Sequence, residues 1–268
     1  MLKKLLKYDL KWVFKVVIVF YLLALFFAVL TRLFFGMNNS FMMNIVAQIC
    51  SGTTIGMMVS IIINNIMRLW VRLKNNFYGD ESYLTHTLPV EKKTLYISKI
   101  LSSIITLFTS TFVILLTLFV AYYSKENMEM VNNLLLSIAS SYNFSTIGLV
   151  VVLFILLFLE FLNLLQSGYT GIILGHKFNS GKIGFSVLLG FITYIVTQLL
   201  VLLIVYILGL FNGNIMNLFL TANLDVINIS VIKTIVLFAI LIYLLLFVVV
   251  YIVNFKLFKK GVNVEWRY

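Results

Sequence analysis

Glu160 is the residue whose type and setting point most directly to chemistry. It lies near the middle of an apolar stretch, residues 146–171, with Asn163 and Ser167 at helical spacings on the same face. A carboxylate inside such a stretch is costly unless another group pairs with it. Two interpretations stay open. Glu160 belongs to a translocation path or a proton site, or it is a neutral or hydrogen-bonded residue that fixes helix packing.

Other catalytic or cofactor chemistry has little support in the sequence. His86 and His176 lie in different hydrophilic segments, and no cysteine or carboxylate cluster has metal-ligand spacing near either. The closest approach to a phosphate-binding loop, residues 175–183, has one residue too many between its glycines and Ile183 in place of the required hydroxyl. We therefore expect no catalytic residues, no metal and no cofactor bound by this chain, and no enzyme.

The composition is that of a membrane protein. Of the 268 residues, 62% are hydrophobic and 11% charged, and the mean hydropathy of +1.08 lies outside the range of soluble domains. The net charge of +11 comes from basic residues beside apolar stretches, where lipid headgroups explain them better than nucleic acid does. We expect one transmembrane domain over residues 1–268, in contact with lipid and without a nucleic-acid partner.

Six apolar runs are long enough to cross a bilayer as α-helices, which takes about 20 residues. They predict an all-α integral membrane fold with spans at residues 16–36, 41–67, 100–123, 146–171, 185–210 and 231–254.

Basic residues give the orientation. Of the 20 lysines and arginines, 17 lie in the N-terminal tail, in residues 68–99, in the loop around His176 or in the C-terminal tail. Positive residues concentrate on the cytoplasmic side of membrane proteins, so both termini are expected in the cytoplasm.

The first 15 residues predict an interfacial amphipathic helix. Leucines, Trp12 and Val13 share one side of the helical wheel and five lysines share the other, which suits the boundary between headgroups and acyl chains. Asp9 falls in the apolar sector. Either it meets a cation or a helix end elsewhere, or the helix is tilted and Asp9 reaches water.

The hydrophilic segment 68–99 predicts a helix, a short crossing helix and a second helix. Gly79 is expected to end the first helix at positive φ, Asp80 or Ser82 to cap the short helix, and Pro89 to begin the last helix. Such an element suits docking to a cytoplasmic partner. The alternative is a structured loop that only reverses the chain.

Residues 79–90, GDESYLTHTLPV, followed by Leu95 and the pair Ser98-Lys99, resemble the loop between the second and third spans of type-2 ABC exporter permeases. Members of that family commonly show an acidic-Gly-Tyr-Leu, Thr-Leu-Pro-Val and Ser-Lys succession there. They also show a Tyr-acidic-Leu-Lys N-terminal helix, similar to residues 8–11. Ser82 departs from the family pattern, in which glycine is frequent at that position. The resemblance implies a coupling helix that sits in a cleft of an ATPase subunit, formed by Asp80, Glu81, Ser82, Tyr83, Leu84, Thr85, His86 and Thr87.

The resemblance also implies partners and a location. ATP and Mg would be bound by a separate cytoplasmic ABC ATPase, in two copies, together with a second permease subunit, the same or homologous, in a bacterial cell membrane. Residues 211–230 would form a re-entrant helix on the outer side. The exported substrate would be a peptide, an antibiotic or another amphiphile. The alternatives are a gradient-driven transporter or channel that uses Glu160 and a non-transporting membrane scaffold.

Overall fold

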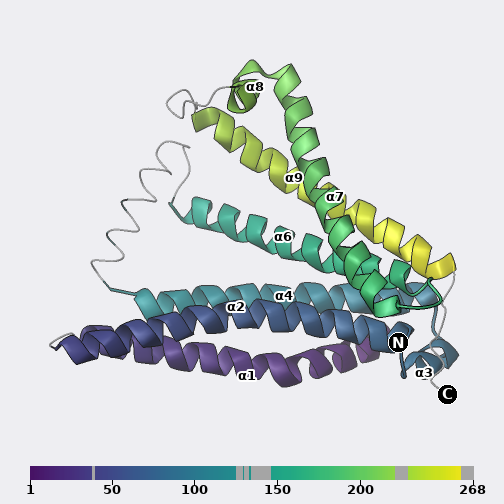
Figure 1. The fold of residues 1–268 in the computed structure, drawn as a ribbon, viewed down its shortest axis with the longest axis horizontal. Coiled ribbons are helices and arrows are strands. Elements are labelled where there is room, and N and C mark those ends of the chain that lie inside the picture. The colour runs from purple at the N-terminus through teal and green to yellow at the C-terminus, as the bar shows by residue number, and fades with distance from the viewer. Residues whose placement is uncertain (38–39, 125–128, 130–132, 134–145, 221–228, 261–268) are drawn as a thin grey trace. The chain divides into compact units, whose positions relative to one another are not determined.

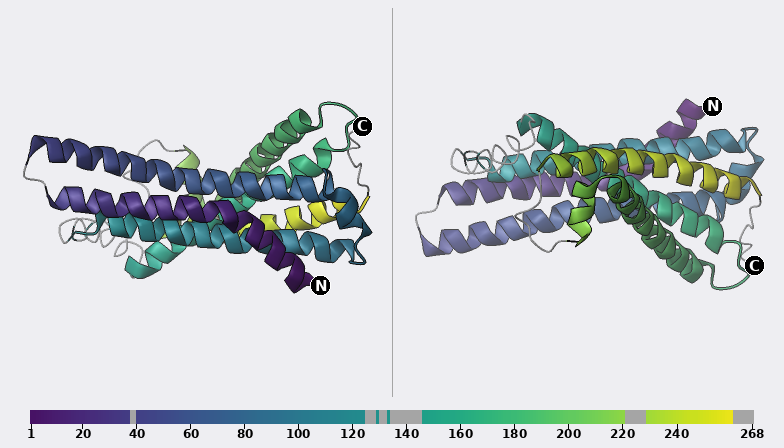
Figure 2. Two further views of the ribbon diagram at one scale, coloured as in Figure 1. Left: turned by 90° about the horizontal axis from the view of Figure 1, so that it is seen from below. Right: turned by 90° about the horizontal axis from the view of Figure 1, so that it is seen from above.

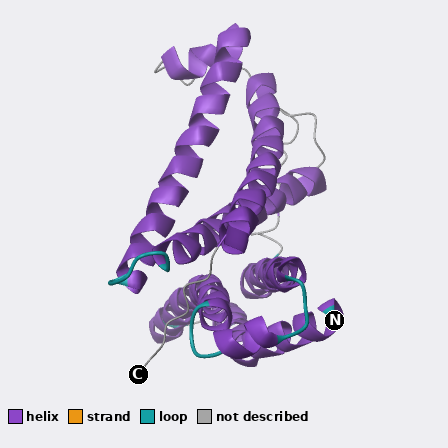
Figure 3. Ribbon diagram, turned by 90° about the vertical axis from the view of Figure 1, so that its right-hand side faces the viewer, coloured by secondary structure: helices purple, strands orange, loops and turns teal. Residues whose placement is uncertain are grey.

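The computed structural model describes residues 1–37, 40–124, 129, 133, 146–220 and 229–260, and within these ranges the chain consists of helices and loops without a strand (Figure 3). The helices group into two compact units, Met1–Val131 and Asn132–Tyr268. The predicted all-α fold is thus confirmed for the described residues. The expectation of a single domain stays a prediction.

The first unit is a bundle of three long helices with a short fourth helix at one end. The long helices α1 (Leu2–Gly36), α2 (Phe41–Phe77) and α4 (Lys92–Tyr122) pack against one another, and α3 (Ser82–Thr87) lies at the end of the bundle that also carries the N-terminus (Figure 1). Small buried residues, including Ala24 and Ala28, let the α1 backbone come close to its neighbours. We refer to this end of the first unit as the α3 end.

The second unit contains α6 (Thr146–Gly175), α7 (Lys182–Phe211), α8 (Gly213–Leu220) and α9 (Ile229–Lys260), as Figure 1 shows. α6 packs on both α7 and α9, and α8 packs on α7. A Cβ atom added at Gly171 would overlap the backbone of Ser186 and Gly190, so α6 and α7 touch backbone to backbone at this point. Any larger residue at Gly171 would push the two helices apart.

All six predicted spans are helical, and within the described residues six helices are long and apolar enough to cross a membrane. Several helices continue past the predicted span ends. α2, for example, runs to Phe77 instead of residue 67, because Leu69, Leu73 and Phe77 repeat every four residues and are buried in the bundle. Membrane crossing therefore accounts for only part of the length of α2.

The first 15 residues do not form a separate helix. α1 continues without interruption from Leu2 to Gly36, although its first turns bend away from the rest of the helix (Figure 2). The five N-terminal lysines are exposed and Val13 is fully buried, as the amphipathic pattern predicts. That this part of α1 lies along a membrane surface stays a prediction.

The link between α2 and α4 has the predicted order of helix, short helix and helix, but three details differ. Gly79 does not have positive φ; Gly181 is the only glycine with positive φ in the described residues. Instead, a Cβ at Gly79 would lie 3.1 Å from Asn75 Cα, so glycine allows a close backbone approach. The N-cap of α3 is Glu81 and not Asp80 or Ser82, and α4 begins at Lys92, three residues after Pro89.

The predicted outer segments are described only in part. α8 covers the first half of the expected re-entrant segment, and residues 221–228 lie outside the described residues. Most of the loop at residues 124–143 also lies outside them. A re-entrant role for α8 therefore stays a prediction.

Candidate functional site

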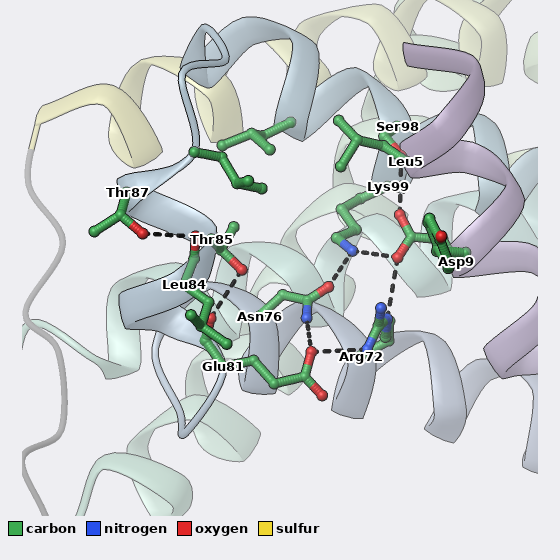
Figure 4. A pocket seen from close by; sticks show the side chains of 13 residues that line it. Leu5, Asp9, Arg72, Asn76, Glu81, Leu84, Thr85, Thr87, Ser98 and Lys99 are labelled. Atoms are coloured by element: carbon green, nitrogen blue, oxygen red, sulfur yellow. Dashed lines mark hydrogen bonds and ion pairs between the residues drawn. The ribbon is translucent and has the colours of Figure 1, made fainter. Parts of the chain in front are cut away.

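A cluster of charged and polar side chains lies at the α3 end of the first unit. At its centre is Asp9 of α1, which is only 3% exposed. Asp9 Oδ1 accepts hydrogen bonds from Lys99 Nζ at 2.6 Å and from Arg72 Nε at 3.0 Å, and Ser98 Oγ donates to Asp9 Oδ2 at 2.9 Å (Figure 4). Of the two alternatives for Asp9, the structure shows the pairing with cations.

The cluster extends from Asp9 to the turn that precedes α3. Arg72 Nη1 donates to Glu81 Oε2 at 2.8 Å, Asn76 Nδ2 donates to the same carboxylate, and Lys99 Nζ donates to Asn76 Oδ1. We call the six residues the Asp9 cluster: Asp9, Arg72, Asn76, Glu81, Ser98 and Lys99.

The Asp9 cluster contains two cations and two carboxylates. Because its charges balance and its donors have acceptors, the burial of Asp9 and Lys99 is tolerated. The pair between Arg72 and Glu81 is weaker, since the Glu81 side chain is 47% exposed to solvent. Polar contacts thus connect the start of α3 directly to α2 and, through Arg72 and Asn76 of α2, to α1 and α4.

Trp12, expected in the N-terminal helix, packs beside this cluster. The Arg68 guanidinium lies 4.3 Å from the centre of the Trp12 ring and Arg72 lies 5.3 Å from it. Arg68 Nη2 also donates to the Trp12 carbonyl oxygen at 3.1 Å. Cation–π contacts therefore add to the attachment of α1 to α2.

By exposure, the eight residues predicted for the coupling helix form an inner set, which is Glu81, Ser82, Thr85 and His86, and an exposed outer set. Ser82 is buried, His86 Nε2 donates to the Phe77 carbonyl oxygen at 3.2 Å, and Thr85 Oγ1 donates to the Glu81 carbonyl oxygen. The outer set comprises Asp80, Tyr83, Leu84 and Thr87.

Tyr83 and Leu84 are the large apolar members of the outer set. They are 67% and 68% exposed, and Leu88, just after α3, is 44% exposed. Two neighbouring residues before α3, Phe77 and Tyr78, are by contrast almost completely buried, and burial raises the pKa of the Tyr78 phenol. The chain just before α3 is thus buried in the bundle, whereas Tyr83, Leu84 and Leu88 are exposed.

A pocket of about 510 Å³ opens between α3 and the N-terminal part of α1. The Asp9 cluster lines one part of it, and the rest is lined by Leu5 and Tyr8 of α1, by Leu84, Thr85 and Thr87 of α3, and by Leu88 and Leu95 (Figure 4). The pocket combines apolar walls with charges that are already paired. It therefore suits an inserted side chain of a partner better than a free anion.

A second polar cluster surrounds Glu160 in the second unit. Glu160 Oε1 accepts hydrogen bonds from Tyr194 Oη at 2.6 Å and from Gln198 Nε2 at 2.7 Å. Tyr243 Oη donates to Gln198 Oε1 at 3.2 Å. We call Glu160, Tyr194, Gln198 and Tyr243 the Glu160 cluster, which joins α6, α7 and α9.

The residues predicted to accompany Glu160 have other surroundings. Asn163 Nδ2 donates to Thr197 Oγ1 at 3.1 Å, and Ser167 is buried. The partners of Glu160 on α7 were not predicted, although a signal was present: Tyr194, Thr197 and Gln198 put three polar groups on one face of a mostly apolar helix.

In the described ranges, no group of three or more His, Cys, Asp or Glu residues could hold a metal ion. Comparisons with protein-family models, curated proteins and solved structures find no match for this chain. The family resemblance therefore rests on the sequence motifs alone.

Proposed function

We propose that this chain is the membrane permease subunit of an ATP-binding-cassette exporter and that α3 docks on a separate ATPase subunit. The observation that carries the proposal is the exposed pair Tyr83 and Leu84 on a short helix whose first residue, Ser82, is buried and whose His86 donates a hydrogen bond to the Phe77 carbonyl oxygen. Two adjacent, exposed, large side chains on a fixed helix have the form of an interface anchor.

The Asp9 cluster supports the same proposal. A docking helix transmits force only if it is attached to the helices that must move, and the cluster attaches the start of α3 to α1, α2 and α4. In this proposal, closure of the ATPase subunits around ATP and Mg moves α3, and the paired charges carry the movement into the helices.

The rest of the assembly is part of the proposal. Two ATPase subunits and a second permease subunit, the same or homologous, complete the exporter in a bacterial cell membrane. Both termini lie in the cytoplasm, and the cargo is a peptide, an antibiotic or another amphiphile.

The test is the double substitution Tyr83→Ala with Leu84→Ala. We expect it to remove most of the ATPase that co-purifies with the tagged chain in mild detergent, because truncation of central anchors costs about 2 kcal/mol or more each. The matched control is Tyr123→Ala with Leu118→Ala. It removes the same two side-chain types from exposed positions near the other end of α4, where the Tyr123 ring contacts Phe119 and lies 5.5 Å from the Arg32 guanidinium.

Unchanged co-purification of the ATPase with the α3 variant would contradict the docking role. A loss that occurs equally in the control variant would point to general damage to the fold. Gel filtration of both variants shows whether the helices remain assembled.

A gradient-driven transporter is the second candidate, because the Glu160 cluster offers an ionisable group inside an apolar helix. It predicts transport without an ATPase and loss of transport in Glu160→Gln.

A further inference from the structure

Two arginines of α2 contact the ring of Trp12, and they differ in their partners. Arg72 pairs with the carboxylates of Asp9 and Glu81. Arg68 lies closer to the ring, at 4.3 Å, but it forms no ion pair with a described residue. Its hydrogen bond goes to the Trp12 carbonyl oxygen, which carries no full charge. The positive charge of Arg68 is therefore not neutralised by the part of the chain that the structure describes.

Trp12 and Arg68 meet at the level where two apolar runs end. On α1 the apolar run 16–36 begins four residues after Trp12, and on α2 the run 41–67 ends just before Arg68. Because the Arg68 guanidinium donates to the Trp12 carbonyl oxygen, these two ends lie side by side. Tryptophan is enriched at the boundary between membrane and water, and arginine extends its charge to the same level. We therefore expect this contact at the depth of the lipid phosphates.

A second cation lies beside this contact. Lys15 follows Trp12 by three residues, so both side chains lie on the same side of α1, and Lys15 is exposed. Arg68 is partly exposed, so its guanidinium can be reached from outside the bundle. Across α1, α2 and α4 the only acidic residue is Asp9, which is 3% exposed and already pairs with two other cations. An anion that neutralises Arg68 and Lys15 must therefore come from outside these helices.

The phosphate of a lipid headgroup has the chemistry that fits these groups. A guanidinium matches two phosphate oxygens, a lysine ammonium adds a second charge-assisted hydrogen bond, and the Trp12 ring can contact the upper part of an acyl chain. A zwitterionic headgroup would bring its own cation towards Arg68 and Lys15, which favours a lipid with net negative charge. We propose that Trp12, Lys15 and Arg68 form a binding site for the headgroup phosphate of an anionic phospholipid. The inference goes beyond the proposed exporter function and does not rest on it.

Tryptophan fluorescence can report which lipid lies beside this site. The chain has three tryptophans, so Trp70→Phe with Trp266→Phe leaves Trp12 as the only one. The full chain is placed in vesicles of equal parts phosphatidylcholine and phosphatidylglycerol, with bromine on the acyl chains of one lipid or the other. Bromine quenches tryptophan only at short range, so the ratio of the two quenching strengths gives the preference of the site. We expect stronger quenching by brominated phosphatidylglycerol.

Two variants remove a cation from the site, and a third is their matched control. Arg68→Gln and Lys15→Gln should each lower the preference for phosphatidylglycerol about fivefold, the factor that one basic residue contributes near an anionic bilayer surface. Lys3→Gln removes the same charge from an exposed position nine residues before Trp12, about 14 Å along α1. This separation exceeds the Debye length of about 8 Å at physiological salt, so the preference at Trp12 should change by less than about twofold.

Inorganic phosphate separates a lipid from a soluble anion as the ligand. Added at constant ionic strength, it should leave the quenching by brominated phosphatidylglycerol unchanged, because acyl chains hold the lipid at the site and free phosphate has none. Displacement of the lipid by inorganic phosphate would overturn the assignment to a lipid.

The proposal is also overturned if both brominated lipids quench Trp12 equally. It is overturned as well if Lys3→Gln lowers the preference as much as Lys15→Gln does, which would indicate a general attraction of anionic lipid to the basic helix. Lys15 is exposed, so its substitution tests the site even if Arg68→Gln does not fold. No ATPase takes part in this assay, so its result is independent of whether α3 docks on one.

Discussion

Removing the charge of Asp9 should destabilise the first unit strongly. Asp9→Asn keeps the size of the side chain but leaves Lys99, which is 6% exposed, and the largely buried Arg72 without their shared carboxylate. Breaking a buried ion pair on one side costs about 3–5 kcal/mol. We take about 3 kcal/mol, because Arg72 keeps Glu81 and Lys99 keeps Asn76 as partners.

The single cysteine offers a direct assay. Cys50 is buried in α2, so a thiol-reactive fluorescent dye labels it only when the first unit opens on heating. At about 2–4 °C per kcal/mol for a chain of this size, the expected drop in the apparent Tm is about 6–12 °C. The matched control Asp80→Asn removes the same charge from an exposed position and should change the Tm by about 2 °C or less.

A double substitution separates pairing from general damage. Asp9→Asn with Lys99→Met removes both charges of the closest pair, so its loss of stability should be smaller than the sum of the two single losses by about 1 kcal/mol or more. Additive losses, or a drop of under about 2 °C for Asp9→Asn alone, would refute the view that paired charges hold the α3 end together.

Two further substitutions test the packing of each unit. Gly171→Ala places a Cβ against the Ser186 backbone, so it should reduce the monodisperse fraction in gel filtration, whereas Gly184→Ala, which meets nothing within 4 Å, should be neutral. Trp12→Ala removes the ring beneath two arginines and should lower the stability of the first unit by about 1–2 kcal/mol, measured with the same dye. Trp12→Phe should recover part of this loss. Equal losses for the two variants would exclude a cation–π contribution.

The long helices could be predicted from the sequence because their signal is local. A run of about 20 apolar residues indicates a span by itself, and all six predicted spans are helical. The short helix after Gly79 was also predictable, since polar residues and Pro89 interrupt the apolar pattern on either side of it. Length and hydropathy do not fix where helices such as α2 end, because packing against neighbours extends them beyond the membrane-crossing part.

The partners within the two polar clusters could not be predicted in the same way. Asp9 meets Arg72 and Lys99 across 63 and 90 residues of sequence, and Glu160 meets Gln198 across 38. Such contacts depend on how helices rotate and pack, which hydropathy does not specify. The predicted positive φ at Gly79 was wrong for a related reason. Glycine at this position allows the backbone to pass close to Asn75, and it does not form a left-handed turn.

The most direct test of the account is affinity purification of the tagged chain from its native membrane in mild detergent, followed by mass spectrometry of the proteins that accompany it. The account predicts an ABC ATPase in a one-to-one ratio with the permease chains, lost in the Tyr83→Ala, Leu84→Ala variant. Recovery of the chain alone, or only as a complex with itself, would contradict the exporter assignment.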